Sequence, residues 1–111
     1  MSYTATGILG ADGGGIENKL LATLSMTTTL LSDNLARAPR TLATGGGLFN
    51  ALGASASLIF SAVTGNTVSG SPGQGGGVFN SLGMVISFLS LVTGNTPDNC
   101  FPPGTIAGCT N

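Results

Sequence analysis

Charged side chains are scarce in this sequence. Asp, Glu, Lys and Arg together make up 6% of the 111 residues, whereas ordinary soluble proteins contain about 25%. The formal net charge is −1, so electrostatic repulsion between copies of the chain is weak. No charged residue occurs between Thr41 and Pro97. We therefore expect this part of the chain to be covered by something other than water, either lipid or other subunits.

Histidine and tryptophan are absent, and only three residues are basic. Without His, a nucleophilic Ser has no ready base, and three cations are too few to neutralise a nucleic-acid backbone. The four acidic residues are scattered and form no general acid–base pair. The sequence contains no Gly-Lys dipeptide and no GxGxxG string, and its two cysteines are too few for a zinc site. The sequence predicts no enzyme activity, cofactor, metal ion, small-molecule substrate or nucleic-acid partner.

Glycine, by contrast, is abundant, and one glycine-rich string occurs three times. Residues 13–20 read GGGIENKL, residues 45–52 read GGGLFNAL, and residues 75–82 read GGGVFNSL. All three follow the pattern GGG-φ-x-N-x-L, where φ is aliphatic, at spacings of 32 and 30 residues. Self-similarity at such a period is typical of one supersecondary unit used repeatedly.

The repeat divides the chain into segments of one predicted domain. This domain spans residues 1–111, and its segments are an N-terminal arm (1–12), three repeats (13–44, 45–74 and 75–96) and a Cys-containing tail (97–111).

Each repeat contains an apolar run of 14 to 18 residues, which is long for a strand and suits a helix. In these runs, small residues recur four positions apart, which would place them on one helical face for close packing. These residues are Gly53, Ser57 and Ser61 in the second repeat, and Gly83 and Ser87 in the third. The sequence thus predicts a mainly α fold with Gly-rich linkers and a non-helical tail, its three helices lying near 16–36, 47–64 and 77–93.

A β-rich assembly is the alternative fold. The string VTGNTV at 63–68 places Gly-Asn between β-branched residues, which is typical of a two-residue hairpin. The similar string TGNT at 93–96 is followed by Pro97, which would damage the outgoing strand. We therefore favour helices.

The two cysteines lie in the tail. Cys100 and Cys109 are nine residues apart with Pro-Pro-Gly between them, which suits a local disulfide worth about 2.5–3 kcal/mol. Two free thiols or bridges between chains are the alternatives. A disulfide would indicate an oxidising location, either extracellular or at the surface of a cell or particle.

These observations favour a non-enzymatic structural subunit that assembles with copies of itself, through apolar low-charge helices, into a filament, sheath or coat. Apolar side chains of the second and third repeats are expected to form the core of that assembly. They are Leu48, Phe49, Leu52, Leu58, Phe60, Val78, Phe79, Leu82, Ile86, Phe88 and Leu89.

The alternative function is a small membrane-embedded helical hairpin, such as a virion membrane component, a holin-like protein or a pore-forming protein, with lipid as its partner. As helices, the runs 48–64 and 78–93 would be roughly 24–26 Å long, short of a hydrocarbon core of about 30 Å. Arg37 and Arg40 would stay cytoplasmic, and a hairpin would return the cysteine tail to that reducing side. A membrane hairpin and a bridged tail are therefore mutually exclusive.

Overall fold

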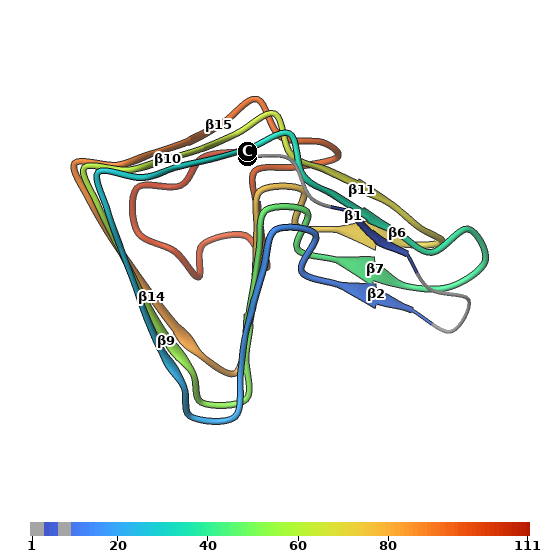
Figure 1. The fold of residues 1–111 in the computed structure, drawn as a ribbon, viewed down its shortest axis with the longest axis horizontal. Coiled ribbons are helices and arrows are strands. Elements are labelled where there is room, and N and C mark those ends of the chain that lie inside the picture. Colours follow the sequence, from blue (N-terminus) through green and yellow to red (C-terminus); the bar gives the residue numbers. More distant parts are fainter. Residues whose placement is uncertain (1–3, 7–9) are drawn as a thin grey trace.

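The computed structural model describes residues 4–6 and 10–111, and every regular element in these residues is a β-strand (Figure 1). The predicted mainly α fold is therefore wrong, and the β-rich alternative is the one that matches. The incorrectly predicted helices are those near 16–36, 47–64 and 77–93.

The chain winds through successive coils, and each strand pairs in parallel with the strand at the same place in the next coil. The first coil contains β1 (Thr4–Thr6), β2 (Ala11–Asp12), β3 (Ile16–Asn18), β4 (Thr23–Thr27) and β5 (Leu30–Ser32). The second contains β6 (Leu35–Arg37), β7 (Ala43–Thr44), β8 (Leu48–Ala51), β9 (Ser55–Ile59) and β10 (Ala62–Thr64). The third contains β11 (Thr67–Ser69), β12 (Gly73–Gln74), β13 (Val78–Ser81), β14 (Met84–Phe88) and β15 (Leu91–Thr93), and β16 (Cys100–Phe101) follows in the tail. The architecture is a parallel β-solenoid.

Five sheets run along the solenoid, and we call them sheets A to E. Sheet A contains β1, β6 and β11, and sheet B contains β2, β7 and β12. Sheet C contains β3, β8, β13 and β16, sheet D contains β4, β9 and β14, and sheet E contains β5, β10 and β15. Figure 1 shows that sheets C, D and E enclose a triangle, and that sheets A and B form a lobe beside it. Each part has its own cluster of buried apolar side chains.

The predicted Gly-Asn hairpin does not form. β10 pairs with β5 and β15, and β11 pairs with β6, so the strands flanking Gly65 and Asn66 are not partners of each other. Gly65 has a φ of 67° and turns the chain from sheet E into sheet A. The string VTGNTV is therefore a corner of a coil.

The helix prediction failed because each apolar run crosses such a corner. In β9, Ala56 and Leu58 are buried in the triangle, while Ile59 points outward. Phe60 then takes a left-handed conformation (φ 48°) and also points outward, before Ser61 is buried again. Two consecutive outward residues reset the alternation of period two that identifies a strand. The complete run consequently lacks that period.

The repeated glycines form the neck between the triangle and the lobe, where coils approach closely. A Cβ added to Gly46 would lie 2.4 Å from the Gly76 carbonyl oxygen of the next coil and 2.7 Å from the Thr67 carbonyl oxygen. Gly45 has a φ of 62°, a conformation that glycine adopts without cost. The glycines are therefore required by close packing and by the turn.

Buried asparagines form hydrogen-bonded ladders at two of the corners. Asn18, Asn50 and Asn80 of the repeat pattern are linked by side-chain bonds of 2.8 and 3.0 Å between successive coils. A second ladder contains Asn34, Asn66 and Asn95. Every described buried side-chain nitrogen or oxygen has a hydrogen-bond partner, so the polar corners avoid the desolvation cost of unpaired amides.

The tail covers one end of the triangle. β16 extends sheet C, and Asn99 Oδ1 accepts hydrogen bonds from the backbone and side chain of Asn95, ending the second ladder. Ile106 is buried in the core cluster of the triangle. Cys100 and Cys109 form a disulfide, with their Cα atoms 6.3 Å apart, which holds this covering segment closed on itself.

Candidate functional site

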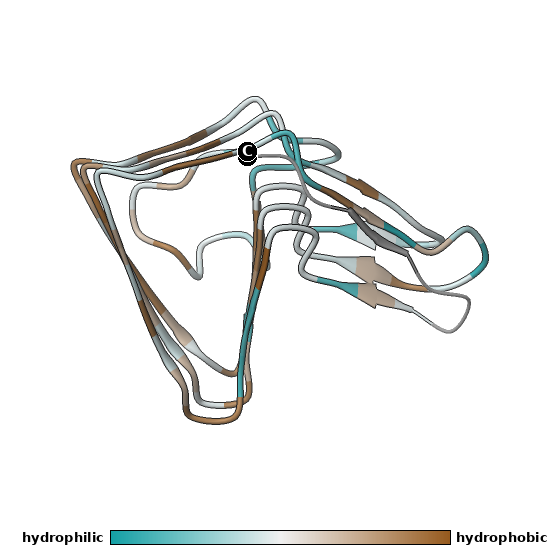
Figure 2. Cartoon of the chain, viewed as in Figure 1, coloured by the Kyte–Doolittle hydropathy of each residue, from teal (hydrophilic) through white to brown (hydrophobic). Residues whose placement is uncertain are grey.

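Large apolar side chains project from the corner between sheets C and D in every coil. We call this row the leucine ridge, and its members are Leu20, Leu21, Leu52 and Leu82. Their exposed fractions are 70%, 81%, 48% and 81%. Figure 2 shows the apolar colouring of this corner and of the next corner along the coil. Burial of these side chains by a partner would be favourable because each exposes a large apolar area.

The backbone at the ridge is strained. All four leucines have positive φ angles, between 56° and 66°. A non-glycine residue in this conformation costs about 1–2 kcal/mol, and Asn or Gly would be tolerated better. A sequence that keeps leucine at the same strained, exposed position in every coil indicates a function for the exposed side chain.

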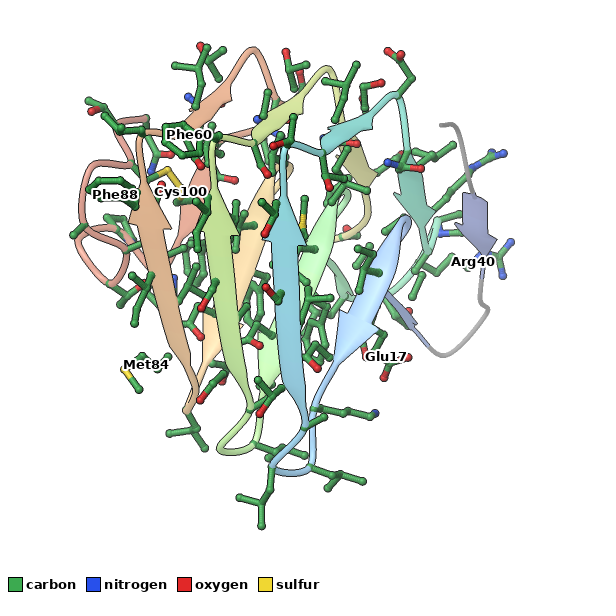
Figure 3. All side chains as sticks on the ribbon, turned by 60° about the vertical axis from the view of Figure 1, so that its left-hand side comes forward. Glu17, Arg40, Phe60, Met84, Phe88 and Cys100 are labelled. Atoms are coloured by element: carbon green, nitrogen blue, oxygen red, sulfur yellow. A yellow bond between two sulfur atoms is a disulfide. The ribbon has the colours of Figure 1, made fainter. Side chains whose placement is uncertain are left out.

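A second exposed apolar surface covers the third coil of sheet D and its corner with sheet E. Phe60 and Phe88 contact each other with ring centroids 6.0 Å apart, and Leu89 also has a positive φ. Met84 and Ile86 project from the same face of β14 and are more than half exposed. Figure 3 shows Phe60 and Phe88 at one end of sheet D and Met84 towards the other.

The apolar character of sheet D rises along the solenoid. Ser25, Ser57 and Ile86 occupy the same register position in β4, β9 and β14. In the next outward row, Thr27 and Ile59 are followed by Phe88. The third coil is thus the apolar end of this face.

A concave surface lies where sheet B meets sheet C. It contains a cavity of about 310 Å³, near the lower limit for small-molecule pockets. Three phenylalanines stack along sheet C at its outward positions: the ring centroids of Phe49 and Phe79 are 5.5 Å apart, and those of Phe79 and Phe101 are 5.6 Å apart. We call this surface the aromatic groove. The cavity is lined by Asp12, Lys19, Leu42, Thr44, Phe49, Ala51, Leu52, Phe79 and Ser81.

The charges of the groove lie in the first coil, where Glu17 takes the register position of Phe49. Lys19 Nζ lies 2.6 Å from Glu17 Oε1. This hydrogen bond and the charge of Glu17 raise the pKa of Lys19, and the carboxylate of Asp12 raises it further. Asp12 also accepts a hydrogen bond from the Thr44 hydroxyl. The first coil of the groove therefore carries two carboxylates, Asp12 on the wall formed by sheet B and Glu17 on sheet C, and one ammonium, Lys19, which is paired with Glu17.

The structure separates the predicted assembly residues into three groups. Leu48, Leu58 and Val78 are fully buried within the triangle of the same chain. Phe49 and Phe79 line the groove. The others are exposed at corners or on β14, and they are Leu52, which also lines the groove, Phe60, Leu82, Ile86, Phe88 and Leu89.

The predicted helical packing face is wrong because the residues assigned to it lie in strands and corners. Gly53 and Gly83 follow the ridge leucines, Ser57 and Ser87 lie in β9 and β14, and Ser61 is buried at a corner. Ser61 Oγ accepts a hydrogen bond from the backbone N–H of Thr29 in the preceding coil. The four-residue spacing of these small residues therefore reflects the positions of strands and corners along each coil and not the period of a helix.

Sequence reasoning missed Leu20, Leu21, Asp12 and Lys19. Leu20 was recognisable, since it holds the final leucine of the repeat pattern, as Leu52 and Leu82 do. Asp12 and Lys19 carried no such signal, because they meet only through the packing of the lobe against sheet C.

Within residues 4–6 and 10–111, the His, Cys, Asp and Glu side chains form no group of three that could hold a metal ion. The same residues include no helix long and apolar enough to cross a membrane. No protein-family model, no curated protein and no solved structure matches this chain.

Proposed function

We propose that this chain is a non-enzymatic structural subunit that associates with copies of itself at an extracellular location or on the surface of a cell or particle. The observation that carries the proposal is the row of exposed leucines and phenylalanines at strained corners of successive coils. The low net charge supports it, because copies repel one another weakly. The disulfide of the tail supports the oxidising location.

The exposed face of sheet D supports association in the same way. Its strands carry no charged residue, so burying the face between copies desolvates no ion. Such a face adds to the leucine ridge, and two separate surfaces on one subunit are what growth into a filament, sheath or coat requires.

The test measures the molar mass of the purified chain by sedimentation velocity across a range of concentrations. We expect reversible association with a dissociation constant near 1 µM, which corresponds to roughly −8 kcal/mol. Electron microscopy of the associated fraction then shows whether the copies form ordered polymers. A chain that stays monomeric up to about 100 µM, roughly −5.5 kcal/mol, would refute the proposal.

Two matched substitutions on sheet D test whether its third coil takes part. Ile86→Lys and Ser25→Lys place the same charge at the same register position of β14 and β4. We expect Ile86→Lys to reduce polymer growth and Ser25→Lys to leave it unchanged, because Ile86 lies within the apolar third coil.

A further inference from the structure

The outer face of sheet D has one apolar strand beside strands that are rich in hydroxyl groups. Figure 3 shows this face with its three strands side by side. The outward residues of β4 are Thr23, Ser25 and Thr27, those of β9 are Ser55, Ser57 and Ile59, and those of β14 are Met84, Ile86 and Phe88. The face therefore changes from polar in the first coil to fully apolar in the third.

The apolar end of this face is large enough to form the centre of an interface between two copies. We call it the β14 strip, and its members are Met84, Ile86, Phe88, Phe60 and Leu89, each more than half exposed. Because a large apolar side chain covers on the order of 200 Å², the strip exposes roughly 500 Å². A stable pair of proteins buries about 800 Å² on each partner. The strip thus supplies more than half of that area, and the neighbouring hydroxyl rows can supply the rim.

The order of the strands selects how a second copy packs on this face. Two sheets pack face to face about 10 Å apart, and a two-fold axis between them can run along the strands or along the solenoid. An axis along the strands would place the first coil of each copy on the third coil of the other, with Ser25 against Ile86. An axis along the solenoid brings coils of equal number together, so the two β14 strips bury each other. Only the second arrangement keeps hydroxyl groups at a solvated rim.

The side chains of β14 suit this axis because they are arranged symmetrically about Ile86. Met84 and Phe88 lie two residues before and after it, on the same face of the strand. An axis that passes over the row of Ser25, Ser57 and Ile86 reverses the strand direction, so Ile86 faces Ile86 of the other copy. Met84 of each copy then meets Phe88 of the other, and a thioether beside an aromatic ring is a favourable contact. Every outward side chain of the third coil therefore has an apolar partner.

We propose that two copies of this chain pack sheet D against sheet D with parallel solenoid axes, with the β14 strips at the centre and the first coils at the rim. The proposal rests on the self-association proposed above and names the surface and the symmetry that carry it. A bilayer fits the strip less well, because no Lys or Arg lies between Thr41 and Pro97 to contact anionic headgroups. The contact is isologous and closes after two copies, so growth beyond the pair requires a second surface, for which the leucine ridge is available.

Charge substitutions at Ile86 test the axis, because this residue faces itself in the pair. Ile86→Lys and Ile86→Glu each place two like charges at the centre, whereas an equimolar mixture of the two variants places opposite charges there. By sedimentation velocity, we expect each variant alone to raise the dissociation constant at least about 30-fold, and the mixture to recover about tenfold in affinity. Ser25→Lys, at the same register position on the rim, should change it less than about threefold. Circular dichroism checks that all three variants are folded.

Crosslinking tests which coils meet. Both native cysteines are joined in the disulfide, so a single introduced cysteine is the one free thiol. Ser25→Cys and Ile86→Cys are mixed and treated with a bismaleimide whose spacer bridges the roughly 10 Å between packed sheets. We expect crosslinks only between identical variants, and intact-mass spectrometry identifies them because the three crosslinked dimers differ in mass. A predominant mixed dimer would show that first and third coils meet, and would overturn the parallel arrangement.

The outcomes separate this proposal from self-association in general. If the wild-type chain associates and Ile86→Lys associates equally well, self-association stands and the pairing through sheet D is overturned. Failure of the mixture of Ile86→Lys and Ile86→Glu to recover affinity overturns the two-fold axis. A monomeric wild-type chain refutes both proposals, and a monomeric chain that sediments with phosphatidylcholine vesicles identifies a lipid surface as the partner of the β14 strip instead.

Discussion

Asn66 is the position at which the buried ladders can be tested most directly. Its Oδ1 accepts hydrogen bonds from the backbone N–H and Nδ2 of Asn34, at 3.0 and 2.9 Å. Its Nδ2 donates to the Leu31 carbonyl and to Asn95 Oδ1, at 2.9 and 3.0 Å. The side chain thus joins three successive coils through four hydrogen bonds, and its residue is fully buried.

Replacing Asn66 with leucine removes all four bonds and leaves several buried groups without these partners. The two donors of Asn34 and the carbonyl of Leu31 each lose a bond, at about 1–3 kcal/mol for a buried group that finds no substitute. Because such losses are not fully additive, we expect the free energy of unfolding to fall by about 4 kcal/mol, a large part of the roughly 5–15 kcal/mol available to a small domain.

The assay is urea unfolding followed by far-ultraviolet circular dichroism, with Ser69→Ala, at an exposed position three residues further along the chain in β11, as control. We expect the control to change the free energy of unfolding by less than about 0.5 kcal/mol. A loss below about 1 kcal/mol for Asn66→Leu would refute the view that the ladder stabilises the solenoid.

The variant Asn66→Asp adds a pH dependence of known sign. The introduced carboxylate faces the oxygens of Leu31 and Asn95 without water, so its pKa in the folded state rises above the value of about 3.9 in the unfolded chain. Stability lost to the charge is therefore recovered as the pH falls through the raised folded pKa, and the deficit against wild type is smallest below about pH 3.9. A deficit that does not vary with pH would contradict this reasoning.

Two further predictions concern the neck and the tail. Gly46→Ala should lower the free energy of unfolding by about 3 kcal/mol, since the added methyl group meets backbone carbonyls that cannot move aside. Gly104→Ala is the control: its methyl group has open space but a φ of 79°, so the substitution should cost only about 1 kcal/mol. Equal losses for the two variants in calorimetry would contradict a steric role of Gly46 in the neck. Replacing both Cys100 and Cys109 with serine should lower the melting temperature by about 10 °C, because the loop loses about 2.7 kcal/mol of chain constraint. An unchanged melting temperature would show that the tail is held by Asn99 and Ile106 alone.

The sequence made the repeat visible but hid the type of secondary structure. Each coil needs an amide at its corner and glycines at its neck, so Asn18, Asn50 and Asn80 recur with the glycines before them. The alternation of buried and exposed residues along a strand is interrupted at each corner. Phe60 shows why, since it adds a second outward residue between two strands. A run containing two strands and a corner therefore resembles a helix in length and composition.

The candidate site was predictable only in part, for a similar reason. Leu52 and Leu82 were predicted to be assembly residues because they are large and apolar, and they are exposed, but the same criterion selected Leu48 and Val78, which are buried within the chain. Only the alternation within each strand separates these groups, and the corners conceal it. The groove could not be predicted from the sequence, because its two walls, the lobe and sheet C, come together only in the folded chain.

The second coil contacts the first coil and the third coil through the same kinds of interaction. Asn66 offers Asn34 the same acceptor that Asn95 offers Asn66, and Gly46 packs on Gly76 as Gly14 packs on Gly46. Nothing in these contacts sets how many coils there are. A duplication of one repeat between the second and third coils would meet compatible neighbours on both sides, and the rod would lengthen by a single strand spacing. The tail marks where this series stops, since Asn99 accepts from the last ladder amide and β16 covers only one sheet. Length is thus a property this architecture can change by whole units, while the chemistry of every corner is kept.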